Sequence, residues 1–514
     1  MARLLRLIRH QTLEKCCFAN RAEFRGEAPL VNRTKCPFSP AFWCRAGEGF
    51  AALSRPVGQT GIFAKASARK RLRGAERILG PALLAALFLA IAAWNGFPLV
   101  FYDTGGYLAE GLQGAFLAER SPVYSLLLFL TGGAFSLWPV VILQSAMTAW
   151  LIALTARSEV AGLSLAGLVT IGVVLMLATG MGWYTGQVEP DCMTALVVLG
   201  AYLLLFRSPF LGPARRTAVA VITGLAVACH PSHLGLMAGL LLVAALLRLM
   251  RGHLQVKILP ALWAFLLALA LIVASNYVLT RQLFLTRSGS VFVFARLMQD
   301  GIVKRLLDET CPQSGYQLCA FKDHLKTRAD AWLWAPDSLF RARGGFHGDH
   351  TEEGRIIADS IRRYPWLHVE AAVRDSVRQF FTFKTGDGIE SQEWILKPDF
   401  QKMMPGQLSE YLAAEQQRGR FRFAAFNMVH VTVGIVSLLG LMLLLQRALI
   451  RRRWDEAALP GLVLTALIGN AIICGTFSNP HDRYQSRVIW LPTLVLALAR
   501  LKNPNVLQPA EEAG

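Results

Sequence analysis

The chain has 514 residues, of which 54% are hydrophobic and 17% are charged, and its mean hydropathy is +0.40. This composition excludes a soluble globular protein of this length and predicts an integral membrane protein. The formal net charge of +19 does not indicate nucleic acid. Residues 1–77 hold 16 Lys and Arg against 5 acids, a net +11, and basic residues beside membrane spans and anionic headgroups explain such an excess.

The first segment, residues 1–77, is predicted to be a basic, disordered cytoplasmic extension. It lacks the basic-then-apolar order of a cleaved signal peptide. A start codon assigned too early is the alternative explanation for the first 70 residues. The Arg-rich run at 69–73 places the start of the first span in the cytoplasm.

Residues 78–276 are predicted to be a transmembrane module with seven spans, because apolar runs of suitable length alternate with Arg-containing loops. The predicted spans are 78–100, 137–155, 163–179, 192–206, 218–229, 234–247 and 258–276. In the first outer loop, residues 107–120 are expected to form an interfacial helix, and a proline opens a short embedded segment after it.

Residues 277–422 are too polar to span a bilayer and are long enough for a compact extracytoplasmic domain, helical or mixed in structure. Residues 423–501 then supply spans 8–10, and 502–514 form a cytoplasmic tail. The predicted fold is therefore an all-α polytopic membrane protein with about ten spans and both termini in the cytoplasm. In this topology the Arg-rich short loops face the cytoplasm and the unusual polar clusters face outward.

Nine cysteines occur in the chain. Cys311 and Cys319, in CPQSGYQLC, fall in the predicted outer domain at a spacing that allows a disulfide, with two free thiols as the alternative. No metal site is predicted, because His347, Asp349 and His350 would need a distant further ligand to bind zinc.

Asp103 is the first candidate site residue. It lies in FYDTGGYLAEG, where the first span reaches the outer membrane surface. A solvated acid that merely ends a helix is the plain interpretation. The two glycines that follow, and the interfacial helix after them, favour a functional turn.

The order of span, Asp, interfacial helix and RSPVYSLLLFL resembles the GT-C superfamily of membrane glycosyltransferases, which includes protein mannosyltransferases and lipid A aminoarabinose transferases. The residues that carry the resemblance are Asp103, Pro122 and Tyr124. GQVEPDCMTALVVLGAYLLLF supplies a second match at Asp191, and HDRYQSRVIWLP supplies an Arg-Tyr pair before the last apolar stretch. The resemblance covers residues 78–276 well and 423–501 loosely, and it leaves 277–422 unplaced.

The resemblance implies transfer of a sugar from a polyprenyl-phosphate donor at the extracytoplasmic face. Such a reaction needs a base for the acceptor hydroxyl and cations for the leaving phosphate. The predicted catalytic acids are Asp103, Asp191 and Glu189. The predicted donor phosphate-binding residues are Arg483, His481, Tyr484, His230, His233 and Arg120.

Each of these residues also has a plainer interpretation. His230 and His233 suit a polar turn between two spans, and Arg483 suits an ion pair with Asp482 or with a lipid headgroup. Glu189 and Asp191 can orient a loop, and they also resemble two metal ligands without a third acid nearby. Metal independence is therefore the favoured prediction, with a divalent metal as the alternative.

The sequence thus predicts a membrane glycosyltransferase of cell-envelope synthesis, inverting at the sugar carbon and placed by the resemblance in a bacterial inner membrane. Its expected partners are membrane lipids, a polyprenyl-phosphate sugar and a glycan, lipid or protein acceptor, without nucleic acid. An O-antigen ligase-like or acyl-transferring enzyme is the first alternative. A transporter or flippase is the second, although repeat halves and charges at mid-membrane are not evident.

Overall fold

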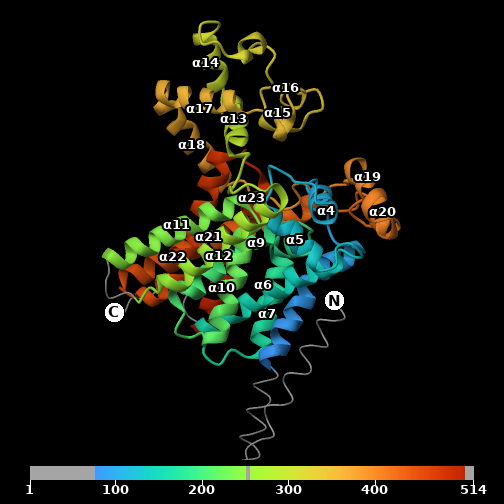
Figure 1. Ribbon diagram of the computed structural model, residues 1–514. Coiled ribbons are helices and arrows are strands. Elements are labelled where there is room, and N and C mark those ends of the chain that lie inside the picture. Colours follow the sequence, from blue (N-terminus) through green and yellow to red (C-terminus); the bar gives the residue numbers. More distant parts are fainter. Residues whose placement is uncertain (1–75, 251–254, 504–514) are drawn as a thin grey trace, which may run out of the picture. The chain divides into compact units, whose positions relative to one another are not determined.

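The computed structural model describes residues 76–250 and 255–503. All of these residues belong to one compact unit. The predictions for residues 1–75 and 504–514 lie outside the described part. Within it, the secondary structure is helical, apart from one isolated bridge between Leu99 and Gln187 (Figure 1).

Six helices of the described part are long and apolar enough to cross a membrane. They are Glu76–Asn95, which ends in α3 (Ala90–Asn95), α6 (Trp138–Glu159), α11 (Pro231–Met250), α12 (Ile258–Thr280), α21 (Phe423–Ile450) and α22 (Trp454–Phe477). The chain is therefore an integral, helical membrane protein by the length and composition of these helices.

The four remaining predicted spans fall on shorter helices. These are α7 (Leu165–Ala178), α9 (Met193–Phe206), α10 (Pro213–Ala228) and α24 (Leu491–Lys502). A helix of 14 residues is about 21 Å long, whereas the hydrocarbon core is about 30 Å thick. The ten crossings expected from the sequence thus stay a prediction.

Proline and glycine set the helix boundaries in the loop that the sequence predicts as the first outer loop. The helix expected over 107–120 is α4 (Thr104–Gln113), which stops early because Gly114 takes a left-handed conformation with φ +70°. The embedded segment is α5 (Pro122–Leu130), with Ser121 as its N-cap and proline at its first position. Gly132, with φ +89°, then separates α5 from α6.

The central helix of the apolar core is α9. All of its residues except the last are buried, and it packs against α6, α10, α11, α12 and α22. A helix that is hydrophobic on every side needs such a surrounding layer. The backbones of α9 and α10 approach closely at Gly200, where an added Cβ would lie 1.9 Å from the Thr223 hydroxyl.

The segment predicted as one outer domain, 277–422, contributes to two large hydrophobic cores and, through Ile389, to a small third cluster with Leu99 and Trp183. Residues 291–371 supply the first, through helices α13 (Gly289–Gln299), α14 (Ile302–Thr310), α15 (Ala329–Trp334), α16 (Leu339–Ala342), α17 (Thr351–Arg363) and the start of α18 (Pro365–Phe380). This part contains the Cys311–Cys319 disulfide.

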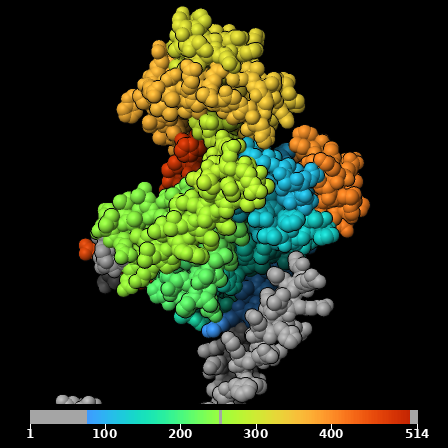
Figure 2. All heavy atoms as spheres, viewed as in Figure 1, coloured from blue at the N-terminus to red at the C-terminus, as the bar shows by residue number. Residues whose placement is uncertain are grey.

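The later helices, α19 (Glu393–Met403) and α20 (Leu408–Ala413), join the main core instead. Phe400 and Tyr411 stack with ring centroids 4.2 Å apart, and Phe97 packs on both rings. In Figures 1 and 2 this orange segment lies beside the blue segment of α4, in agreement with the contact between α19 and α4. The first outer loop is therefore covered by residues almost 300 positions later in the chain.

The close packing of α18 on α22 depends on Gly475. A Cβ at this position would lie 2.6 Å from the Asp375 carbonyl oxygen, which belongs to the backbone and cannot rotate away. We expect Gly475→Ala to destabilise the protein by about 1–3 kcal/mol through this overpacking. Thermal unfolding in detergent measures the effect. Gly469→Ala in the same helix is the matched control, because its Cβ would sit 3.5 Å from Leu236, and equal stability of the two variants would contradict the prediction.

Candidate functional site

An acid and an arginine close the first outer loop. Asp103 precedes α4, and its side chain does not cap the helix. Instead, Arg120 donates from Nη2 to Asp103 Oδ1 at 2.7 Å, and a second contact joins the other nitrogen and oxygen of the pair. The Arg120 guanidinium also lies over the Tyr107 ring, 5.3 Å from its centroid. The bend after α4 thus returns a cation to the acid that precedes the helix.

Two further acids, Glu189 and Asp191, are brought beside Asp103 by the isolated bridge between Leu99 and Gln187. Val188 donates its backbone N–H to the Leu99 carbonyl at 2.8 Å, and Leu99 donates to Gly186 at 2.9 Å. Gln144 of α6 supports this strand-like contact by donating to the Gln187 carbonyl at 2.8 Å. Residues 189–191 therefore follow directly on a segment fixed against residues 99–101.

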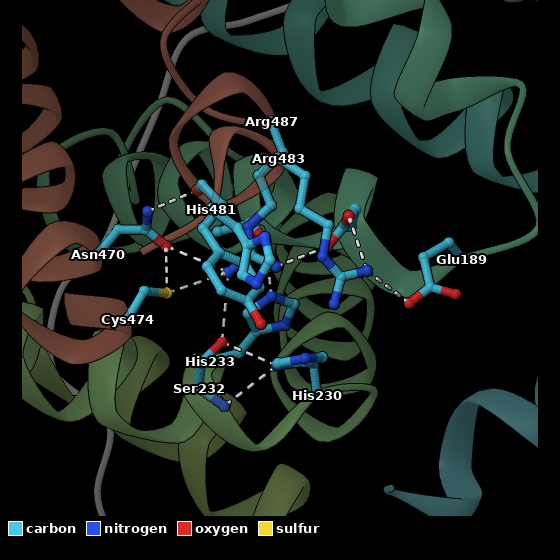
Figure 3. Close-up of polar contacts among 12 residues, drawn as sticks. Glu189, His230, Ser232, His233, Asn470, Cys474, His481, Arg483 and Arg487 are labelled. Carbon is cyan, nitrogen blue, oxygen red and sulfur yellow. Dashed lines mark hydrogen bonds and ion pairs between the residues drawn. The ribbon is translucent and has the colours of Figure 1, made fainter. Parts of the chain in front are cut away.

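The cations opposite these acids come from the short helix α23 (Asp482–Ser486) and the residue after it. Arg483 and Arg487 are four positions apart, so both side chains project from the same side. Arg487 is fully buried and donates to Asp191 Oδ1 at 2.6 Å. It also reaches Asn470 at 3.3 Å and Ser232 at 3.4 Å (Figure 3).

Arg483 is held differently, since no described residue hydrogen-bonds to its guanidinium. The nearest acid oxygens belong to Glu189, at 3.6 Å, and Asp191, at 3.9 Å. Its guanidinium lies over the Phe101 ring, 4.1 Å from the centroid, and 5.0 Å from that of Tyr484. The side chain is only 12% exposed, and its buried Nη1 lacks a hydrogen-bond partner in the described part of the chain.

A second buried guanidinium nitrogen is also unpartnered. Arg120 Nε finds no acceptor among the described residues, although the rest of that group pairs with Asp103. Buried donors are normally satisfied, and an unpaired one costs about 1–3 kcal/mol. With Arg487 Nε, which also lacks a partner among the described residues, three such donors on permanent cations indicate a place where an anion or water accepts hydrogen bonds.

The two carboxyl groups nearest these cations differ in protonation. Burial alone would raise the pKa of Asp103, but the charges of Arg120 and Arg483 outweigh it and lower the pKa below its ordinary value. Burial raises the pKa of Glu189 well above its ordinary value, with a further contribution from the Asp103 charge. Asp103 is therefore the ionised member and Glu189 holds a proton more readily, which is the pattern of acid and base pairs in enzyme sites.

His481 is clamped between two acids. Its Nε2 lies 3.6 Å from Asp330 and its Nδ1 lies 3.5 Å from Asp387. The side-chain amide of Gln379 in α18 donates to the His481 carbonyl and accepts the His481 backbone N–H, both at 2.8 Å. Asp387 also accepts the backbone N–H of Arg483 at 3.1 Å. The residues around the imidazole thus fix the loop that presents Arg483.

The clamp predicts a pH-dependent stability. Burial would lower the pKa of His481, but hydrogen bonds to Asp330 and Asp387 raise it to about 10. Since the folded-state pKa is raised, the stabilisation is complete below the ordinary pKa of about 6.5 and is lost as pH rises through about 10. We expect the wild type to lose more thermal stability between pH 7 and pH 10.5 than His481→Gln.

Thermal unfolding of the purified chain in detergent at both pH values measures this difference. The control is His324→Gln, which removes an exposed histidine of the outer segment. If the wild type and His481→Gln lost the same thermal stability at alkaline pH, the contacts of His481 with Asp330 and Asp387 would contribute nothing to stability.

The other residues predicted to bind the donor phosphate differ in how many of their side-chain atoms already have a partner within the protein. Both ring nitrogens of His233 are engaged, at 2.7 Å from Thr194 Oγ1 and 2.8 Å from the Ala226 carbonyl. His230 pairs through Nδ1 with Ser232 at 2.8 Å, and burial together with nearby cations lowers its pKa well below the ordinary value. Tyr484 lies 3.3 Å from the Ser478 hydroxyl. Neutral His230 can offer one hydrogen bond, whereas His233 has no free nitrogen.

Sequence reasoning did not single out several residues of the cluster. Arg487 was within the quoted stretch HDRYQSRVIWLP, and its spacing of four from Arg483 was the available signal. Phe101 is the first residue of the quoted stretch FYDTGGYLAEG but was not assigned a role. Asp330 and Asp387 come from segments of the outer region that showed no pattern, so only the folded chain reveals their contact with His481.

No group of three His, Cys, Asp or Glu side chains among residues 76–250 and 255–503 has a metal-binding arrangement. Comparison with family models, with curated proteins and with solved structures finds no match. The class that the fold defines is therefore a helical integral membrane protein with a buried cluster of acids and arginines (Figure 3).

Proposed function

We propose that the protein is a membrane glycosyltransferase that moves a sugar from a polyprenyl-phosphate donor to a lipid, glycan or protein acceptor. The observation that carries this proposal is Arg483, a buried permanent cation without a hydrogen-bond partner among the described residues, placed beside Asp103, Glu189 and Asp191. These residues are separated by up to 380 positions in the sequence. Their convergence supports one reaction centre.

The phosphate of the donor is assigned to Arg483 and Arg120, two of the three arginines of the cluster that have an unpartnered donor among the described residues. A guanidinium binds phosphate oxygens in a forked geometry, and its charge is permanent. Arg483 is backed by an aromatic ring at 4.1 Å, which fixes the plane of the group. Arg120 contributes a second donor from the first outer loop. Together they stabilise negative charge as the sugar–phosphate bond breaks.

Asp103 is assigned as the base. It is ionised, since its pKa is lowered, and a carboxylate that accepts the proton of the acceptor hydroxyl increases the nucleophilicity of that oxygen. The new bond forms from this oxygen to the sugar carbon, and the lipid phosphate leaves with the bonding electrons. Attack opposite the leaving phosphate inverts the configuration at that carbon.

Glu189 and Asp191 set the charge of the cluster. A protonated Glu189 removes one negative charge that would otherwise repel a donor phosphate. Asp191 neutralises the buried Arg487 through the 2.6 Å ion pair, which keeps that arginine in place behind the site. His481 is assigned a positioning role, because its contacts are with Asp330, Asp387 and Gln379.

Donor-dependent transfer in reconstituted membranes tests the proposal. Radiolabelled polyprenyl-phosphate sugars are supplied with an acceptor fraction extracted from cells that lack the protein. The wild type should release polyprenyl phosphate and label the acceptor, and Arg483→Gln should do neither. Label transfer that is equal in vesicles with and without the wild-type chain would rule the function out.

A further inference from the structure

An open cavity of about 260 Å³ lies beside the loop that carries Arg483. Its wall is formed by Phe381, Thr382, Phe383, Lys384, Val431 and Asp482. Asp482 begins α23 and immediately precedes Arg483. The cavity is therefore adjacent to the proposed site without including any residue that was assigned to catalysis.

One side of this cavity belongs to the exposed apolar face of α21. Met428, Val431 and Ile435 are spaced three and four residues apart, which places them along one side of the helix. Met428 is 71% exposed and Ile435 is 47% exposed. Exposed apolar side chains on a candidate membrane span face lipid. The cavity at Val431 consequently opens on a lipid-facing surface.

The other side continues an exposed apolar stripe along α18. The stripe consists of Trp366, Val369, Val373, Val377 and Phe381, all more than half exposed. The opposite face of α18 is buried through Ala371, Asp375 and Gln379. Phe381, 68% exposed, ends the stripe and lines the cavity.

The position of the C-terminal end of α18 along the spans follows from its contacts with α21 and α22. The Phe383 ring would lie 3.1 Å from a Cβ on Gly434, eleven residues inside the outer end of α21. Asp375 touches Gly475 in the last turn of α22. Phe383 thus packs about 16 Å along α21 from the start of that helix, whereas Asp375 meets the last turn of α22.

The polar part of the cavity holds one cation and one acid. Lys384 is exposed, and no described residue pairs with its ammonium. Its backbone N–H donates to Asp482 Oδ1 at 2.6 Å, which keeps the lysine at the rim. An ammonium at the rim of an apolar channel matches a lipid phosphate joined to an apolar chain.

We propose that this cavity binds a phosphate-bearing lipid of the outer leaflet, with the phosphate at Lys384 and the chain against Phe381 and Val431. The binding itself does not require the transfer reaction. The two sources of this chemistry are an ordinary bilayer phospholipid and a polyprenyl phosphate. Only the second, as a route of the donor to Arg483, rests on the proposed function.

Native mass spectrometry of the purified full-length chain in detergent tests the proposal, with undecaprenyl phosphate and phosphatidylglycerol as separate probes. We expect Lys384→Gln to weaken binding of at least one probe about tenfold, because it removes the charge-assisted contact. Phe381→Ser should weaken the same probe through lost contact with the chain. Lys326→Gln is the control, since it removes a lysine of the outer segment that pairs with Asp337.

Preferential loss of undecaprenyl phosphate binding supports a donor route, and loss of both probes supports a site for bilayer lipid. Unchanged affinity of Lys384→Gln and Phe381→Ser for both probes overturns the proposal. Asp103→Asn is measured in parallel and should retain wild-type lipid binding. If the protein shows no sugar transfer, the lipid-binding measurement can therefore still be interpreted. If the variants do not change lipid binding, the result of the transfer assay is unaffected.

Discussion

Asp103→Asn is expected to reduce sugar transfer by at least about a hundredfold and by up to about ten thousandfold, the range for loss of a general base. The amide has nearly the same shape as the carboxylate but does not accept the proton of the acceptor hydroxyl. It also removes one charge from the pair with Arg120. The measurement is initial transfer rate at saturating donor in reconstituted vesicles.

The matched control is Glu119→Gln, which removes an acid of the same outer loop, one residue before Arg120. It should transfer within about threefold of the wild type, since half-buried Glu119 forms no hydrogen bond or ion pair with another described residue. Equal protein yield and equal unfolding temperature of both variants exclude misfolding as the cause. Full activity of Asp103→Asn would remove this residue from the mechanism.

Arg483→Gln is expected to lower the turnover number by about 10²–10³-fold, the range for loss of one donor to a developing negative charge. Arg483→Lys should recover only part of that activity, because an ammonium keeps the charge but not the forked pair of donors. The effect should appear in the turnover number more than in the donor KM, since the phosphate gains charge as the bond breaks.

Arg362→Gln is the control for Arg483, because this arginine is 78% exposed and its ion pair is with Asp359. Steady-state transfer at several donor concentrations separates the two kinetic parameters. A variant Arg483→Gln with normal turnover and a raised KM would assign the residue to ground-state binding. Normal values of both parameters would place the donor phosphate elsewhere.

The helices were largely predictable because their signals are local. Pro122 and the glycines at 132–133 separate two apolar runs in the sequence, and the structure has α5 and α6 at those places. Length was less predictable, since the expected spans around α7 and α9 include loop residues such as Thr179. The helix after Asp103 also differs in length from the expected one, because Gly114 ends it.

The candidate site was predictable only in part, because its contacts join distant segments. Asp103, Asp191 and Arg483 each carried a visible signal at an expected outer membrane surface. By contrast, the clamp on His481 depends on Asp330 and Asp387, which approach it only through the packing of α18 and the outer segment. Periodicity and charge patterns do not contain that information.

The most direct test of the central claim is a mass-spectrometric analysis of polyprenyl-phosphate sugars and surface glycans in three cell populations. One lacks the protein, one carries the wild type and one carries Asp103→Asn. We expect one polyprenyl-phosphate sugar to accumulate, and one surface sugar to disappear, both without the protein and with Asp103→Asn. Unchanged lipid and glycan pools in all three populations would contradict the transferase and make transport the leading explanation.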